Sequence, residues 1–347
     1  MTPPKEPSTP KASAGPKRLM LYAPFAVLLI VAAAWTVGWF WMRGEVFRRM
    51  DAGALRLAES GYGVDWSARS LSGFPFRLDL DITAPRLRET SGWGLSAPRL
   101  KAEAFVFAPE HWVLVAPDGV TLNRRVGGAV LVGARVLRGS LSDIGDHPPR
   151  VSVEAMGLTF VPGPGASPVA ITSAEEVHFH AKAGPNDQGA AYFEIDKARS
   201  AGAGLLADIA AGAPVTLIAD AIFSHAAALK GQGFAGALRG WTASAGNLSV
   251  RRLSLQAGTV TAEAGSGTLA VGADGRLNGV LDLRLKQGAR LLKTWGGRAG
   301  LTPEAATSAE GVIAAHAQGD VSIVTAHFQA GQTTIGPVAI GPSPRIY

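Results

Sequence analysis

The chain has 347 residues, of which 47% are hydrophobic, enough for one large or two ordinary domains with a hydrophobic core. Its net charge is +6, but the basic residues are spread along the chain, which argues against a nucleic-acid-binding surface and against nucleic acid as a partner. The absence of cysteine excludes disulfides, thiolate metal sites and cysteine nucleophiles.

The N-terminal region predicts a tail followed by a membrane anchor. Residues 1–18 are rich in Pro, Ser and Lys, a composition typical of a disordered tail. Residues 19–42 carry no charge and would span about 36 Å as a helix, more than the roughly 30 Å of a hydrocarbon core. Tyr22 near one end, and Trp39, Phe40 and Trp41 near the other, match an aromatic belt. We therefore expect a single transmembrane helix over 19–42, with the membrane as a partner.

The residues that flank this segment indicate its orientation. A short tail that ends in Lys17 and Arg18 is expected to stay in the cytoplasm, while a long domain is exported largely regardless of its charge. The alternative is a cleaved signal peptide with a small-residue site at residues 32–34. Because the apolar run continues to Met42, it is too long for an ordinary signal peptide, and we favour the anchor. Both interpretations export the domain.

A second helix is expected directly after the anchor, over residues 43–61. Phe47, Met50, Ala54 and Leu57 recur at the spacing of one helix face, and Gly61 is a suitable C-terminal stop. This connecting amphipathic helix is expected to pack on the domain that follows, because a coiled coil would need more heptads.

From residue 62 onward the hydrophobic period changes to two. Residues 74–82 predict a half-buried strand that carries Phe74 and Phe76 on its apolar face and Asp79 and Asp81 on its wet face, so we expect a structural role for Phe76. Asp-Gly pairs predict hairpins at residues 118–119 and 274–275. Further strands are expected over residues 100–107, 130–136, 151–160, 175–182, 192–195, 215–223, 247–256, 281–286 and 321–328.

Helical signals are few in this part of the chain. Short helices are expected over residues 234–245, 288–295 and 302–316, the last opened by Thr302 as N-cap and Pro303 at the first helical position. Many strands joined by tight turns predict a mainly β fold of antiparallel sheets. Residues 198–213 have little strand character, so we expect two β-rich lobes, over 62–200 and 201–347.

Three patterns are candidates for chemistry, and each has a simpler interpretation. Residues 231–236 fit G-x-G-x-x-G, but no strand precedes them and no acid follows about 20 residues later, so a dinucleotide site is not indicated. His178 and His180, with Glu175 and Glu176 nearby, could supply ligand atoms for zinc. Because no metal-binding motif accompanies them, we favour a polar strand face. Asp79 and Asp81 are explained by a solvated strand exterior.

No serine-hydrolase or P-loop motif occurs in the chain. We therefore assign no catalytic, cofactor-binding or metal residue, and we expect a protein that is not an enzyme and needs no cofactor.

The most distinctive motif is Ser72-Gly73-Phe74-Pro75-Phe76, which leads into a strand. With the segment from Ala97 to Pro109 and the glycine-punctuated half from Trp241 to Val338, it resembles a bacterial family of unknown function, DUF2125, from about residue 20 to the C-terminus. The family has no established catalytic residues that the resemblance could assign to this chain. The architecture is also similar to the AsmA-like group, in which an inner-membrane helix precedes amphipathic strands in a periplasmic groove, and which is associated with lipid transport and envelope integrity.

The resemblance and the patterns together predict a single-pass inner-membrane protein with its domain in the periplasm. We expect its sheets to bind a lipid or acyl chain in an apolar groove, as part of envelope maintenance, with headgroups near rim residues such as Arg284 or Lys286. The alternative is a structural or interaction module with a filled core that binds an envelope protein. An excess of apolar residues over what one core can bury would favour the groove.

Overall fold

The fold is a computed structural model that describes residues 19–146, 148–202, 204–299 and 301–347. The tail expected over residues 1–18 lies outside the described residues. The chain divides into two compact units, Met1–Arg49 and Met50–Tyr347.

Helix α1 (Leu19–Glu59) joins the predicted anchor and the predicted connecting helix into one continuous element. It is the one helix in the described part of the chain that is long and apolar enough to cross a membrane. Large apolar side chains between Tyr22 and Val37 are exposed, an arrangement that suits lipid rather than water. A possible single membrane span near the N-terminus therefore agrees with the sequence.

The second unit is built on one antiparallel sheet of 21 strands, so the mainly β prediction is confirmed. The sheet forks at β11 (Arg150–Pro162). The first part of β11 pairs with β10 (Val136–Ser142), and its last residues pair with β9 (Gly128–Gly133). Two branches therefore meet at one strand.

Each branch contains five strands. In spatial order from the fork, the first branch is β10, β7 (Ala108–Val115), β6 (Arg99–Phe105), β3 (Arg77–Thr83) and β2 (Ala68–Ser72). The second branch is β9, β8 (Val120–Arg124), β5 (Gly94–Ser96), β4 (Arg86–Glu89) and β1 (Tyr62–Asp65).

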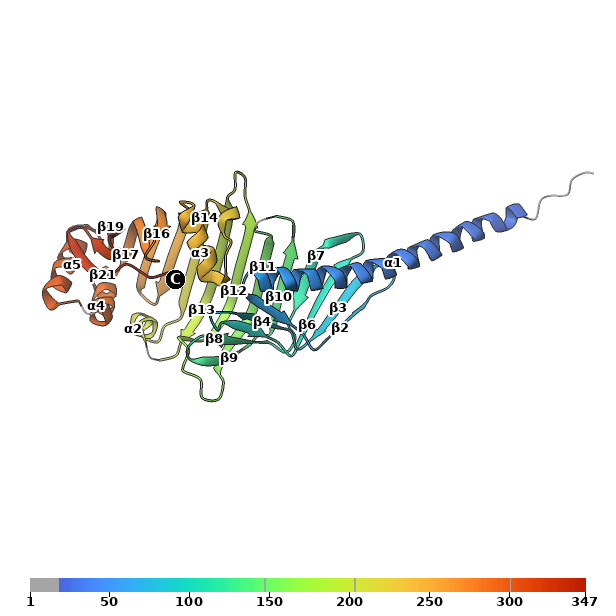
Figure 1. The fold of residues 1–347 in the computed structure, drawn as a ribbon. Coiled ribbons are helices and arrows are strands. Elements are labelled where there is room, and N and C mark those ends of the chain that lie inside the picture. The colour runs from blue at the N-terminus through green and yellow to red at the C-terminus, as the bar shows by residue number, and fades with distance from the viewer. Residues whose placement is uncertain (1–18, 147, 203, 300) are drawn as a thin grey trace, which may run out of the picture. The chain divides into compact units, whose positions relative to one another are not determined.

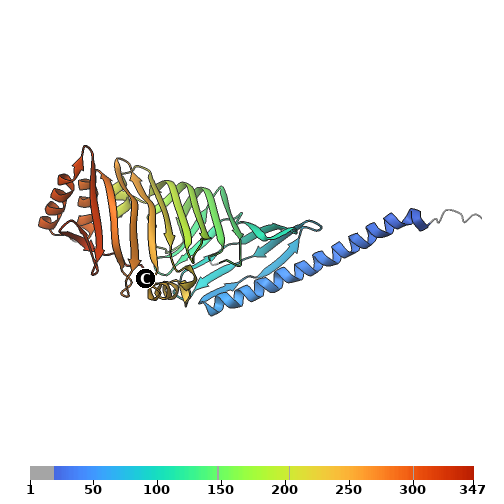
Figure 2. The same cartoon turned by 90° about the horizontal axis from the view of Figure 1, so that it is seen from above.

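On the other side of β11 the sheet continues as one long row. Its strands stand side by side in chain order in Figures 1 and 2. They are β12 (Ile171–Ala183), β13 (Gly189–Ser200), β14 (Val215–Phe223), β15 (Asn247–Ala257), β16 (Val260–Val271), β17 (Leu277–Lys286), β19 (Val321–Gln329), β20 (Gln332–Ile335) and β21 (Val338–Pro342), with β18 (Ala317–Gln318) on β19.

The lobe boundary predicted near residue 200 falls between two neighbours of this row. β13 and β14 are hydrogen-bonded from Gly189↔Phe223 to Ala198↔Val215, so the sheet runs without a break from residues 62–200 into residues 201–347. The segment between these strands holds a short helix, α2 (Leu205–Ala210), which the sequence had not suggested.

The two predicted hairpins have different outcomes. The hairpin at Asp274-Gly275 is confirmed, because Val271 of β16 pairs with Leu277 of β17. The prediction of a hairpin at Asp118-Gly119 is wrong. The turn forms, but β7 before it belongs to the first branch and β8 after it belongs to the second. An Asp-Gly turn signals a chain reversal, and at a fork the reversed strand finds its partners elsewhere.

The strand predicted over residues 74–82 begins later than expected. β3 starts at Arg77, and Phe74–Phe76 form the turn before it, closed by the hydrogen bond from Arg77 N to Gly73 O at 2.8 Å. Pro75 has no N–H to give to a ladder, and Gly73 takes a positive φ of 99° that favours glycine. Leu78, Leu80 and Ile82 are buried as predicted, but Phe74 and Phe76 are not.

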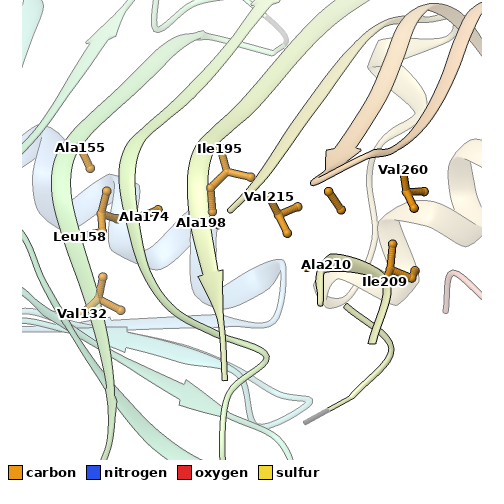
Figure 3. Packing of buried hydrophobic residues seen from close by; sticks show 11 residues of the cluster. Val132, Ala155, Leu158, Ala174, Ile195, Ala198, Ile209, Ala210, Val215 and Val260 are labelled. Atoms are coloured by element: carbon orange, nitrogen blue, oxygen red, sulfur yellow. The ribbon is translucent and has the colours of Figure 1, made fainter. Parts of the chain in front are cut away.

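The sheet has one apolar face, on which residues paired across neighbouring strands form continuous lines of apolar side chains. One row runs from Ala155 on β11 through Ile195 and Leu217 to Leu255 and Leu285 on β17. Helix α2 covers part of this face, where Ile209 and Ala210 pack with Val215 and Val260 (Figure 3). The face is therefore the core side of the unit.

The remaining helices lie where the sequence placed them. They are α3 (Gly233–Ala243), α4 (Gly288–Ala299) and α5 (Pro303–Ala315). A short 3₁₀ helix, η1 (Ala226–Ala228), which the sequence had not suggested, precedes α3. Thr302 caps α5, since its side-chain oxygen accepts a hydrogen bond from Ala305 N at 3.3 Å. Helices α4 and α5 pack on the last strands of the row, where Leu292 and Ile313 join Leu285 and Val324 in a second buried cluster.

Candidate functional site

An apolar cavity of about 540 Å³ lies between the sheet and the helices near the C-terminal end of the row. Strands β15, β16 and β17 form one wall, and helices α2, α4 and α5 with strands β20 and β21 form the rest. The lining residues are Ala170, Leu205, Leu206, Ile209, Leu255, Ala262, Leu283, Leu285, Gly288, Leu291, Leu292, Trp295, Ile313, Ile335 and Ile340.

Helical spacing places the large side chains of α4 on the cavity. Leu291, Leu292 and Trp295 follow the spacing of one helix face, so one side of α4 is apolar. Gly288, at the first turn, lets α4 approach the sheet, since a Cβ there would lie 3.1 Å from carbon atoms of Leu285 and Ile313. The position of α4, and with it one wall of the cavity, therefore depends on a small residue.

The lining offers hydrocarbon contacts and very little polarity. Apart from the Trp295 indole, every lining side chain is aliphatic, and that indole N–H donates to the carbonyl oxygen of Ile340 at 3.3 Å. None of the lining residues that the structure describes is an acid, a base or a nucleophile. Apolar cavities accept apolar guests. The volume lies within the roughly 300–1,000 Å³ of typical ligand pockets.

The apolar face continues beyond the cavity across the row. The next register line contains Val153, Phe179, Phe193, Ala219 and Leu253, from β11 to β15. All five are only partly buried, and the Phe179 side chain is 36% exposed. A sealed sandwich core would bury such a line completely. The sheet thus presents more apolar surface than its covering helices bury.

The G-x-G-x-x-G segment has a structural explanation. Its residues open α3, and the backbone N–H of Phe234 donates to Glu89 Oε1 at 2.6 Å, so a carboxylate of the same chain sits at the helix N-terminus. A Cβ on Gly233 would lie 2.5 Å from that oxygen, and one on Gly231 would lie 2.5 Å from the carbonyl carbon of Gly236. The glycines therefore serve close packing between α3, β4 and the loop before α3.

The histidine pair lies on the polar face of the row. His180 Nδ1 lies 2.9 Å from Ser152 Oγ, and His178 Nε2 lies 3.3 Å from Glu176 Oε2, while Glu175 pairs with Lys197 at 2.7 Å. Among the described residues, no group of three or more His, Asp or Glu side chains is placed to hold a metal ion.

Hydrogen bonds on the same face shift two titratable groups. The bond from Tyr192 Oη to Glu194 Oε2, at 2.6 Å, raises the pKa of Tyr192 to about 12. The Arg138 guanidinium, which donates to Glu154 Oε2 at 2.8 and 2.5 Å, lowers the pKa of Glu154. Tyr192 is held by a neighbour on its own strand and Glu154 by a neighbour on the adjacent strand, and both form part of a solvated polar sheet face.

Other charged candidates also lie on the wet side of the sheet. Asp79 accepts from Arg77 Nε at 3.1 Å, and Asp81 lies 3.8 Å from Arg99, so both form surface ion pairs. Arg284 and Lys286 alternate along β17 with the cavity residues Leu283 and Leu285. The two basic side chains therefore start from the opposite face, and the expectation that they form a rim for headgroups is wrong.

Sequence reasoning missed the helical wall of the cavity. Leu205, Leu206 and Ile209 lie in the segment that it interpreted as a lobe boundary. Their spacing, at i, i+1 and i+4, is the one signal that could have identified a short amphipathic helix there.

Comparison with known proteins gives one match. A family model described as "Uncharacterized protein conserved in bacteria (DUF2125)" matches residues 39–344. No curated protein and no solved structure matches the chain.

Proposed function

We propose that this chain, which belongs to the bacterial DUF2125 family, binds a lipid or acyl chain in the apolar cavity beside α4 and along the adjoining sheet face. The observation that supports the proposal is the cavity itself, with about 540 Å³ of space and an almost wholly aliphatic lining. Because it offers no acid, base or nucleophile, we propose binding rather than catalysis, in the maintenance of the cell envelope.

The energetics favour a hydrocarbon ligand. Each buried methylene contributes about 0.8 kcal/mol, so ten methylenes would contribute about 8 kcal/mol before the costs of association are subtracted. Selectivity among chains is expected to be low, since a wall of aliphatic side chains distinguishes methylenes by length and shape alone. A polar headgroup would remain outside the cavity, because no lining side chain can pair with it.

Uptake of a fluorescent fatty acid by the purified full-length protein tests the proposal. Ala262 lies on the cavity wall, so Ala262→Trp should fill part of the space and weaken uptake at least tenfold. Its neighbour Glu263 is exposed and pairs with Arg284 on the other face, so Glu263→Trp adds the same ring and should leave uptake unchanged.

Native mass spectrometry of the wild-type protein provides a second measurement. Recovery of empty protein only, with no uptake of the probe, would reject lipid binding. The alternative function, an interaction module for an envelope protein, would then remain.

We also propose that the protein is a single-pass inner-membrane protein whose second unit is periplasmic. The apolar segment 19–42 and the preceding Lys17 and Arg18 support this orientation. A reporter enzyme that is active only in the periplasm should be active when it is fused after Tyr347. Activity of a cytoplasmic reporter at the same position, with the periplasmic reporter silent, would reverse the orientation.

A further inference from the structure

Four phenylalanines are exposed together at one end of the first branch of the sheet. Phe74 and Phe76 lie in the turn between β2 and β3, with exposed fractions of 51% and 56%. Phe105 is the last residue of β6 and Phe107 lies in the turn between β6 and β7, with exposed fractions of 62% and 70%. We call these four residues the phenylalanine tip.

The two turns of the phenylalanine tip are joined to each other by a backbone hydrogen bond and a ring contact. The backbone N–H of Val106 donates to Phe76 O at 3.0 Å, and the rings of Phe76 and Phe107 stack with centroids 6.2 Å apart. Phe105 pairs in register with Arg77, the first residue of β3. The rings are therefore held by ordered backbone rather than carried on a loose loop.

The path of the chain shows at which end of the second unit the phenylalanine tip lies. After α1 ends, Ser60 and Gly61 turn the chain into β1. The β1–β4 and β2–β3 ladders keep one continuous register, so β1 and β2 run on in the same direction. The guanidinium of Arg69 on β2 binds both carboxylate oxygens of Asp51, at 2.6 and 2.8 Å.

It follows that β2 runs back along the last turns of α1, from Glu59 toward Asp51. The turn after β2 lies farther in that direction, because Phe74 is five residues, or about 16 Å, past Arg69. Within the second unit, the phenylalanine tip therefore lies toward the end at which the chain enters it, near Asp51, and the apolar segment of α1 precedes Asp51 in the chain.

We propose that the phenylalanine tip inserts into the bilayer surface as a second membrane contact, separate from the transmembrane helix. Contiguous exposed apolar patches on a soluble unit mark membrane or protein interaction sites. Aromatic rings on ordered turns can enter the boundary between headgroups and acyl chains without a large loss of conformational freedom. The chain's own apolar segment favours a bilayer as the occupant, since the proposed membrane anchor would hold this unit beside one. The contact does not depend on the proposed lipid binding in the cavity.

Site-specific fluorescence of the full-length protein in phosphatidylcholine–phosphatidylglycerol vesicles tests the proposal. The natural sequence has no cysteine, so Phe107→Cys and, in a second protein, Phe76→Cys each provide a single labelling site for an environment-sensitive dye. Val126, in the turn between β8 and β9, is 81% exposed, and Val126→Cys is the matched control. Far-UV circular dichroism before and after labelling confirms that each variant is folded.

We expect dyes at positions 76 and 107 to show blue-shifted emission and to lose most of it when the lipids carry doxyl groups on their acyl chains. The dye at position 126 should emit as in water and respond only to aqueous iodide. Water-like emission at both tip positions would overturn the proposal. Shielding from iodide without quenching by doxyl lipid would overturn it as well, and would identify a protein partner or a second copy as the occupant.

Discussion

Leu78 and Phe76 stand two residues apart in sequence, and the structure predicts very different costs for their truncation. Leu78 on β3 is 0% exposed, whereas Phe76 in the preceding turn is more than half exposed. Leu78→Ala removes three buried carbon groups, about 2.4 kcal/mol of transfer free energy, and leaves a cavity that raises the total to about 3–5 kcal/mol. Phe76→Ala removes a ring that is about half exposed, together with its stacked contact to Phe107, and should cost about 1–2 kcal/mol.

Thermal unfolding of the full-length protein in detergent, followed by far-UV circular dichroism, compares the two variants. At about 2–4 °C per kcal/mol, Leu78→Ala should lower the midpoint by roughly 6–20 °C and Phe76→Ala by roughly 2–8 °C. A midpoint for Phe76→Ala as low as that of Leu78→Ala would refute the reasoning. It would mean that the Phe76 ring is a core residue, as the alternating pattern alone suggests, and it would weaken the case for the phenylalanine tip.

Two further predictions use the same assay. Gly233→Ala should lower the free energy of unfolding by at least about 1–2 kcal/mol, because residue 233 has a φ of +65° and its new Cβ would press on Glu89. The control Gly311→Ala lies in open space on α5 and should raise the free energy of unfolding by about 1 kcal/mol, so equal midpoints for the two variants would contradict the prediction. Because Arg138 lowers the pKa of Glu154 in the folded state, the ion pair adds stability above the ordinary value of 4.5 and loses it as pH falls from there through the folded-state value. The midpoint difference between the wild type and Glu154→Gln should therefore narrow as pH falls below 4.5, and a difference that stays the same on acidification would exclude this linkage.

The sequence predicted most elements of the long row because each of these strands pairs with its neighbours in the chain. Alternation over 215–223 and 281–286, with a tight turn at Asp274-Gly275, is enough to predict such a meander. The fork is different. The two ends of β11 pair with different branches, and the residues of β7 and β8 do not indicate which branch each of these strands joins. Local patterns report burial and reversal, while the partner of a strand is a property of the whole sheet.

The cavity shows the same limit at the level of the site. The strands predicted over residues 247–256 and 281–286 correspond to β15 and β17, which carry Leu255, Leu283 and Leu285 on one wall, whereas most of β16 in the same wall was not predicted. The opposite wall comes from two short helices. α2 lies well before those strands in the sequence, and α4 follows β17 directly. A short apolar helix such as α2 has too few turns to show a helical period clearly. Apolar periodicity therefore predicted what is buried but not what covers it.

The distribution of small residues bears on whether the apolar face holds a ligand or simply forms a core. Where the sheet is covered by α2, Ala198, Ala257 and Val260 are completely or almost completely buried, as a packed interior requires. Farther along the face, Ala219 and Phe193 remain partly exposed although the strands are just as apolar there. Burial along the sheet thus follows the extent of the covering helix and not the composition of the strands. An apolar surface left open in this way is costly in water, and a hydrocarbon chain that continues from the cavity onto the face would remove that cost.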